Sequence, residues 1–220
     1  MDMRPRRIGL LVPHTDTTLE WDLQRTFAGQ ASIHTERLFL ESVTIEAEIR
    51  MVEEETPRAL EYLRSIRPDV IVFGCTSAGA LYGVEGEAAF TRSLGESLGC
   101  PAISAFGSVL AHLQRLAVRR LALFTPYPDS VHTKVAASIR ETGVEIVWED
   151  WADLERDEDI GNLDPSDLAS RLGAANLPDG CDAFFASCTN LRIDEVASSV
   201  ATALGVPVFG SNSAIITALA

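Results

Sequence analysis

Short runs of apolar residues, separated by stretches with helical periodicity, dominate the chain. Val70–Phe73 and Ala183–Ala186 each contain four apolar residues with no polar residue between them. Such runs are typical of parallel strands that are buried on both faces. The expected strands are Ile8–Val12, Ser32–Arg37, Val70–Phe73, Ala102–Ser104, Leu121–Phe124, Val144–Trp148, Ala183–Ala186 and Val208–Phe209.

Helical patterns lie between these strands, and the longest runs from Thr44 to Ile66. Thr44 is expected to be its N-cap, and Glu46 and Glu48 fall in its first turn, where the helix dipole favours negative charge. Pro57 is expected to kink this helix or to split it in two. The other expected helices are Thr17–Phe27, Glu87–Leu98, Ser108–Leu116, Ser130–Glu141, Ser166–Leu172 and Arg192–Leu204.

The chain also repeats itself. The segment RRIGLLVPHTD begins at Arg6 and RRLALFTPYPD begins at Arg119, an offset of 113 residues, and the same offset separates Cys75 from Cys188. Alternating strands and helices in both copies predict an α/β fold of two pseudo-symmetric, doubly wound parallel-sheet domains. We expect the first domain to comprise residues 1–116 plus 207–220, and the second to comprise residues 117–206.

Both cysteines of the repeat follow a strand, at the edge of the sheet where doubly wound folds bind ligands. We therefore expect Cys75 and Cys188 to face each other across the cleft between the domains. A helix start after each thiol favours the thiolate and is expected to lower its pKa below the usual value. Two such thiols can act as acid and base on opposite faces of a carbon, or one can add covalently. Polar groups that could hold a substrate follow each thiol: Thr76, Ser77, Thr189 and Asn190.

Composition narrows the class of protein. The net charge of −14 argues against nucleic acid and anionic membranes as partners, and no apolar run is long enough to span a membrane. The chain is therefore expected to be cytoplasmic. Its four cysteines form no CxxC pair and its four histidines are scattered, so no metal or disulfide is expected. Cys100 and Cys181 have no partner in the repeat and are interpreted as small hydrophobic residues.

Five segments carry a resemblance to a known family: RIGLLVPHTDTTLE, VIVFGCTSAG, RRLALFTPYPDSV, DAFFASCTNLR and LGVPVFGSNSA. The chain resembles the aspartate/glutamate racemase superfamily, and within it the maleate cis-trans isomerases, which neighbour the arylmalonate decarboxylases. The resemblance implies a cofactor-independent enzyme that acts on a small carboxylate. A homodimer or higher homo-oligomer is compatible with it.

The resemblance also implies roles for individual residues. Cys75 would be the thiolate that attacks an alkene carbon of maleate, so that the resulting single bond can rotate before the thiolate leaves. Cys188 would be the second catalytic thiol, and Tyr127 would contact the substrate carboxylate. Decarboxylases of the neighbouring family have glycine in place of the first cysteine, so the presence of Cys75 counts against decarboxylation.

Two departures from the family pattern put maleate in question. Asp16 stands where maleate isomerases have an asparagine that binds a substrate carboxylate, and Asp157 stands near a second such asparagine. An ionised aspartate only accepts hydrogen bonds and repels a dianion. This favours racemisation or epimerisation of an amino acid or an ectoine-type cyclic nitrogen compound. The alternative is that Asp16 only caps the helix that begins near Thr17.

A non-catalytic function is also open. A two-lobed protein that binds a ligand in its cleft would tolerate replacement of both cysteines by serine. A dinucleotide site is set aside because no GxGxxG follows the first strand. A redox switch that joins Cys75 to Cys188 is compatible with the repeat but is not needed to explain it.

Overall fold

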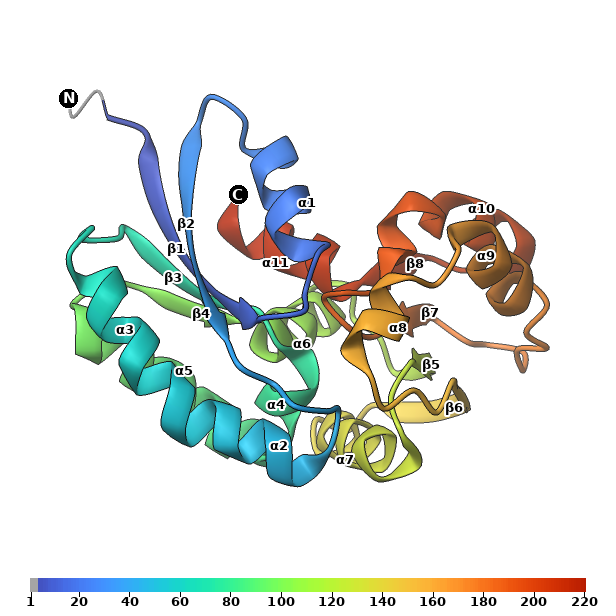
Figure 1. The fold of residues 1–220 in the computed structure, drawn as a ribbon. Helices are drawn as coiled ribbons and strands as arrows, with labels where there is room; N and C mark the ends of the chain where they lie inside the picture. The colour runs from blue at the N-terminus through green and yellow to red at the C-terminus, as the bar shows by residue number, and fades with distance from the viewer. Residues whose placement is uncertain (1–3) are drawn as a thin grey trace.

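The computed structural model describes residues 4–220 and contains two four-stranded parallel sheets (Figure 1). The strand orders are β2-β1-β3-β4 and β6-β5-β7-β8, so both halves share one topology. This confirms the predicted fold of two α/β units. The strands are β1 (Arg6–Pro13), β2 (Ala31–Leu38), β3 (Val70–Phe73), β4 (Ala102–Ser104), β5 (Arg120–Thr125), β6 (Glu145–Trp151), β7 (Ala183–Ala186) and β8 (Val208–Gly210).

Helices cover both faces of the first sheet, as alternation along β1 requires. Ile8 and Leu10 pack with α1 and α11 on one face, whereas Leu11 packs with α2, α3 and α5 on the other. The helices are α1 (Leu19–Thr26), α2 (Ile45–Arg50), α3 (Thr56–Arg64), α4 (Thr76–Ala80), α5 (Gly83–Leu98), α6 (Ala105–Arg115), α7 (Asp129–Arg140), α8 (Asp157–Gly161), α9 (Pro165–Gly173), α10 (Ala197–Leu204) and α11 (Ser211–Leu219).

The long helix after β2 contains an irregular turn shortly before Pro57. Thr44 caps α2 by accepting a hydrogen bond from the N–H of Ala47, as expected. A five-residue π-helical turn, Met51–Glu55, then leads into α3, where Pro57 is the second residue. Proline lacks an N–H and is tolerated in a first helical turn. The chain stays helical through Pro57, so the helix is not split there, and a kink at Pro57 stays a prediction.

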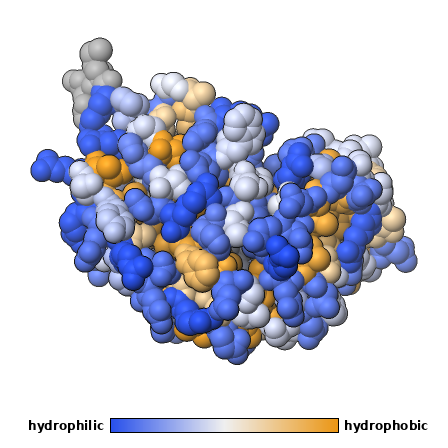
Figure 2. Space-filling model, in the orientation of Figure 1, coloured by the Kyte–Doolittle hydropathy of each residue, from blue (hydrophilic) through white to orange (hydrophobic). Residues whose placement is uncertain are grey.

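Hydrophilic side chains cover most of the face seen in Figure 2, with apolar side chains exposed between them. The large exposed apolar residues include Trp21, Phe39 and Tyr62, each more than half accessible. Within residues 4–220, no helix is long and apolar enough to cross a membrane.

The last strand and the last helix lie in different halves. β8 pairs with β7 in the second sheet, whereas α11 packs against α6 and α1 beside the first sheet (Figure 1). The chain therefore crosses back between the halves after Gly210. The predicted division into residues 1–116 plus 207–220 and residues 117–206 stays a prediction.

Buried hydrogen bonds join the two halves at the carboxyl ends of their central strands. Asn190 Oδ1 accepts from the N–H of Thr17 at 2.9 Å, while its Nδ2 donates to the carboxyl and the carbonyl of Asp157, both at 3.0 Å. The hydroxyl of Thr189 donates to the carbonyl of Gly74 at 3.0 Å. One loop after β7 thus holds the loops after β1 and β3 and the start of α8.

Replacing Asn190 by alanine should destabilise the fold. Its amide donors and acceptor are buried, so truncation leaves the Thr17 N–H and the Asp157 carbonyl without a partner. We expect a loss of about 2 kcal/mol or more in the free energy of unfolding, measured by urea denaturation. Asn162→Ala is the matched control, because Asn162 is an exposed asparagine at the end of α8. Equal effects of the two substitutions would contradict this account of the interface.

Candidate functional site

The two cysteines of the repeat lie in one buried site between the sheets. Cys75 comes two residues after β3 and precedes α4, and Cys188 comes two residues after β7. Their side chains are 5% and 6% exposed. A charge on the Cys75 thiol would raise the pKa of Cys188, so the thiols are near enough to interact. The structure therefore brings together the two thiols that the repeat singled out.

The backbone at Cys188 is strained. Its φ is 100°, a region that residues with a Cβ rarely adopt, whereas Cys75 has an extended backbone with φ −139°. Such strain persists only where the surrounding structure imposes it, and it is commonly found at functional sites. The N–H of Asn190 donates to the Cys188 sulfur at 3.4 Å. Two identical dipeptides thus present their thiols from different backbone conformations.

The expectation that both thiols have a lowered pKa is wrong. Burial raises the pKa of Cys75, and the nearby Glu48 carboxyl raises it further. Burial also raises the pKa of Cys188 well above its ordinary value, with Asp157 as the next cause. α4 has only five residues, so its dipole is too small to offset desolvation and two neighbouring carboxyls. Both thiols are therefore protonated at neutral pH in this arrangement.

Glu48 is a site residue that the sequence pattern alone did not single out. Its side chain is 0% exposed, and Ser77 donates a short hydrogen bond to its Oε1. The Ser77 hydroxyl in turn lies 3.7 Å from the Cys75 sulfur. Burial raises the pKa of Glu48 to about 8, although the Ser77 hydrogen bond opposes this. The Ser77 hydroxyl therefore lies between a buried acid, Glu48, and the first thiol, Cys75.

A signal for Glu48 was present in the helical spacing. The residues three and four positions after it are Met51 and Val52, which belong to the buried face of the helix. An acid within such an apolar stripe is unusual, because carboxyls are rarely buried without a partner or a role. The position of Glu48 in the buried apolar stripe, and not its place in the first helical turn, is the signal that indicates a site residue.

Asp16 reconciles the two roles between which the sequence could not decide. Its Oδ1 accepts from the N–H groups of Thr18 at 3.0 Å and Leu19 at 2.9 Å, and so caps α1. Its Oδ2 is buried and has no partner at hydrogen-bond distance among the described residues, although the Thr189 hydroxyl is near enough to help lower the pKa of the carboxyl. Burial raises the pKa of Asp16 to about 6, with the Leu19 N–H acting in the opposite direction. One oxygen caps the helix, while contact of the other with a substrate stays a prediction.

Asp157 and Tyr127 complete the polar lining. The Thr15 hydroxyl donates to Asp157 Oδ2 at 2.6 Å, and burial raises the pKa of this carboxyl. Tyr127 is 1% exposed and shares a 3.1 Å hydrogen bond with the Ser187 hydroxyl. Burial raises the pKa of Tyr127 well above its ordinary value, and Cys188 adds to this. Tyr127 is therefore a neutral hydroxyl within electrostatic reach of the second thiol.

The remaining polar residues of the two Cys-Thr segments hold the site together. The Thr76 hydroxyl donates to the Ser211 hydroxyl at 2.8 Å, in addition to the Thr189 and Asn190 contacts between the halves. Thr76, Thr189 and Asn190 were all predicted as site residues, and all three are buried. Their predicted contact with a substrate stays a prediction, while their structural contacts explain why threonine and asparagine follow the cysteines.

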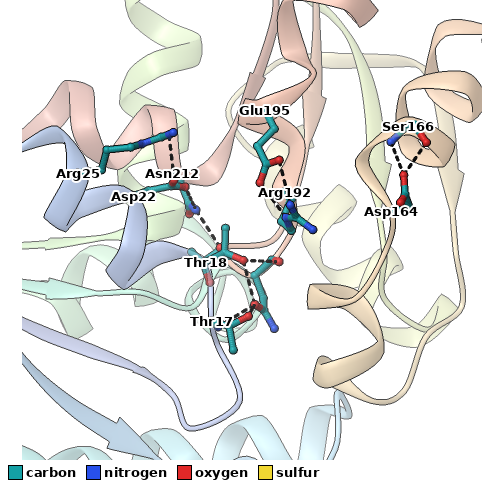
Figure 3. Close-up of polar contacts among 11 residues, drawn as sticks. Thr17, Thr18, Asp22, Arg25, Asp164, Ser166, Arg192, Glu195 and Asn212 are labelled. Carbon is teal, nitrogen blue, oxygen red and sulfur yellow. Dashed lines mark hydrogen bonds and ion pairs between the residues drawn. The ribbon is translucent and has the colours of Figure 1, made fainter.

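Arg192 lies outside this site. Its guanidinium forms a two-pronged pair with Glu195 at 2.7 and 3.0 Å (Figure 3). It lines an open cavity of about 320 Å³, together with Thr17, Thr18 and Trp21 among others. Among residues 4–220, no group of three or more His, Cys, Asp or Glu side chains is placed to hold a metal ion.

Comparison with known proteins gives matches over nearly the whole chain. The family model described as arylmalonate decarboxylase matches residues 8–219. The maleate isomerase of Geobacillus stearothermophilus is 23% identical, over 93% of this chain and 86% of its own length. The arylmalonate decarboxylase of Bordetella bronchiseptica is 30% identical, over 94% of this chain and 86% of its own.

A solved structure shares the fold described above. It is the maleate cis-trans isomerase of Nocardia farcinica, in a cysteine-to-serine variant that carries a covalently bound succinylcysteine intermediate. The two chains superimpose with a TM-score of 0.90 at 22% identity, and the match covers 98% of this chain and 91% of that one. The aligned part of this chain includes both sheets and the site between them.

The stability of Glu48→Gln relative to the wild type should increase as the pH rises. The folded protein holds the Glu48 proton up to a pH of about 8, whereas the ordinary pKa of a free glutamate is 4.5. The folded state therefore binds more protons than the unfolded chain in this window, and the free energy of unfolding falls as pH rises through it. We expect the variant to gain stability over the wild type between pH 5 and pH 8.5, by at least about 1.4 kcal/mol, the equivalent of one pKa unit.

Chemical denaturation at the two pH values measures this difference. Glu46→Gln is the matched control, because Glu46 is an exposed glutamate of the same helix. A Glu48→Gln variant whose stability relative to the wild type does not change with pH would show that Glu48 is ionised in the fold.

Proposed function

The chain belongs to the arylmalonate decarboxylase family, and from this premise we propose that it is a cofactor-independent isomerase of a small carboxylate that uses Cys75 and Cys188. The matches bear out the resemblance to maleate isomerases and arylmalonate decarboxylases. The observation that supports isomerisation most is the pair of thiols, one from each half, in a single buried site. Maleate isomerases among the relatives make maleate the first substrate to test.

The proposed reaction starts with Cys75. Its sulfur forms a bond to one alkene carbon, and the π electrons move to the adjacent carbon and its carboxylate. The former double bond is then single and can rotate. When the carbon–sulfur bond breaks, its electron pair leaves on the sulfur and the double bond forms again in the trans geometry. The succinylcysteine intermediate in the Nocardia farcinica enzyme corresponds to this adduct after the adjacent carbon has taken up a proton, and that proton must leave again before the double bond can form.

Proton movement must accompany this step, because both thiols are protonated at neutral pH. The Cys75 proton has to leave as the carbon–sulfur bond forms, and it has to return when that bond breaks. The Ser77 hydroxyl, 3.7 Å from the sulfur, is placed to take part in this transfer. Cys188, from the opposite half, is placed to donate a proton to the intermediate or to shield it. Cys75 is thus the nucleophile and Cys188 the second acid or base.

The neutral polar groups are proposed to bind the substrate carboxylates. Tyr127 is proposed as a hydroxyl donor, since its raised pKa keeps it protonated. The hydroxyls and N–H groups of Thr76, Ser77, Thr189 and Asn190 would supply further donors from both halves. A cytoplasmic location and a homo-oligomeric state stay predictions.

Racemisation or epimerisation is the second candidate. Two thiols from opposite halves suit removal of a proton from one face of a carbon and delivery to the other. The free Oδ2 of Asp16 favours this candidate, because it lies where a dianion would be repelled. Decarboxylation, the reaction after which the family model is named, is a further alternative. The presence of Cys75 counts against it. A non-catalytic ligand-binding protein remains the alternative outside catalysis.

Proton NMR in deuterated water distinguishes these reactions. Fumarate formed from maleate would establish cis-trans isomerisation, and we expect both Cys75→Ser and Cys188→Ser to lower the rate of the reaction that occurs by at least about a thousandfold, because the two thiols act as a unit. With aspartate, glutamate and ectoine-type compounds, deuterium at the stereocentre that depends on both thiols would establish racemisation instead.

Cys100→Ser and Cys181→Ser are the matched controls for these variants. Both cysteines are free and half-buried, and neither belongs to the repeat. Full activity in all four serine variants would contradict a function based on the two buried thiols. Wild-type protein that neither converts nor exchanges protons in any of the compounds tested would also contradict it.

A further inference from the structure

Three carboxyl groups surround the thiols without a buried cation to balance them. Asp16, Glu48 and Asp157 are all buried. Within the part of the chain that the structure describes, no arginine or lysine side chain is buried. Arg37 approaches the site, but it donates to the backbone carbonyl of Asp16 rather than to its carboxyl. The protein therefore offers this cluster neither a guanidinium nor an ammonium group.

Two oxygens of this cluster make no hydrogen bond with the described residues. They are Asp16 Oδ2 and Glu48 Oε2, each on a side chain that is 0% exposed, although the Thr189 hydroxyl lies near enough to the Asp16 carboxyl to help lower its pKa. The other oxygen of each group is bonded, to the N–H groups that begin α1 and to Ser77. Buried polar atoms almost always have a partner, and exceptions need a reason. A donor supplied by a ligand is such a reason.

The two free oxygens belong to groups that flank the two thiols. Glu48 is linked to Cys75 through Ser77, and its charge reaches Tyr127. The charge of Asp16 reaches Cys188. Asp157 interacts with both carboxyls. The free oxygens therefore belong to the same site as the thiols, and not to a separate pocket.

We propose that Glu48 and Asp16 form a subsite for a positively charged nitrogen of the substrate, an ammonium or amidinium group, so that the substrate is a zwitterionic carboxylate and not a dianion. This inference rests on the proposed function, whose substrate class it narrows. Glu48 is its specificity-determining residue, and Asp16 supplies the second acceptor.

Charge balance supports a cation at this position. A dianion would have to enter a site whose three acids must all stay protonated, whereas a cation pairs with their ionised forms. Ionised Glu48 is the main neighbouring charge that raises the pKa of Cys75, and a cation paired with Glu48 cancels that charge.

Several groups from other elements face Glu48 and share in its titration. Cys75 and Ser77 lie on the segment that leads into α4, Tyr82 precedes α5, and Tyr127 and Asp157 come from the second half. Burial disfavours ionisation of each of the acids among them. A bound cation is expected to ionise Glu48 and Asp16, so that binding releases protons between about pH 6 and pH 8.

Isothermal titration calorimetry with a matched pair of ligands tests the subsite. 4-Aminobutanoate and succinate have four carbons each, but one ends in an ammonium and the other in a second carboxylate, and neither can isomerise. At pH 7.5 we expect the zwitterion to bind at least about tenfold more tightly, a difference of about 1.4 kcal/mol. Titration in buffers of different ionisation enthalpy should show proton release, and affinity for the zwitterion should rise from pH 6 to pH 8.

Substitutions test whether Glu48 and Asp16 cause the preference for the zwitterion. Glu48→Gln keeps the shape of the side chain and should weaken the zwitterion at least about tenfold, while leaving succinate unchanged or tighter. Asp16→Asn keeps an oxygen for the cap of α1 and should weaken the zwitterion in the same direction. Glu46→Gln, on the exposed face of α2, should change neither ligand.

A second measurement does not depend on ligand affinity. Cationic 2-bromoethylamine and anionic iodoacetate both alkylate thiols, and mass spectrometry gives their rates at Cys75 relative to N-acetylcysteine. The subsite predicts a preference for the cation that is lost in Glu48→Gln. Tighter binding of succinate, proton uptake, no binding of the zwitterion at millimolar concentration, or no charge preference at Cys75 would each overturn the proposal.

The two levels of proposal can fail separately. Wild-type protein that converts maleate efficiently but shows no preference for a cation would overturn the subsite and leave the isomerase. A preference for the zwitterion, in a protein whose serine variants are as active as the wild type, would leave the subsite and overturn catalysis by the thiols.

Discussion

The side-chain amide of Asn190 is the contact on which the geometry of the whole site depends. It is buried between the halves and donates and accepts hydrogen bonds to loops of both. Its place also explains Gly161, since a Cβ at that position would lie 2.9 Å from both polar atoms of the amide. Because Asn190 is two residues after Cys188, the contact that joins the halves also positions one of the thiols.

This arrangement makes the site electrostatically unfavourable in isolation. Desolvation raises the pKa of both thiols, three carboxyls and a tyrosine, and the surrounding backbone provides only partial compensation. Groups of this kind lower the stability of a fold, and they are retained where a ligand or a reaction uses them. The free oxygens of Asp16 and Glu48 show where that compensation is missing.

Much of the fold could be predicted, because buried parallel strands leave a clear pattern. The bounds of β3, β4 and β7 agree with the apolar runs, and the repeat led to two sheets of equal topology. The helices α8 and α11 were not predicted, and α4 was expected only as a helix start after Cys75. α4 and α8 have five residues each, too few for a periodic signal, and α11 is apolar nearly all round. The site was harder: the repeat indicated Cys75 and Cys188, but the direction of their pKa shifts depends on burial and on Glu48, which local patterns do not reveal.

The positive φ of Cys188 bears on the history of the duplicated gene. Glycine would occupy that backbone without strain, so stability alone would favour losing the thiol there, and no such pressure exists at Cys75. The two copies therefore kept one dipeptide in two unequal settings. A relaxed thiol beside a helix and a strained thiol in a loop are different reagents, and duplication followed by this divergence gives a division of labour that a symmetric pair could not provide.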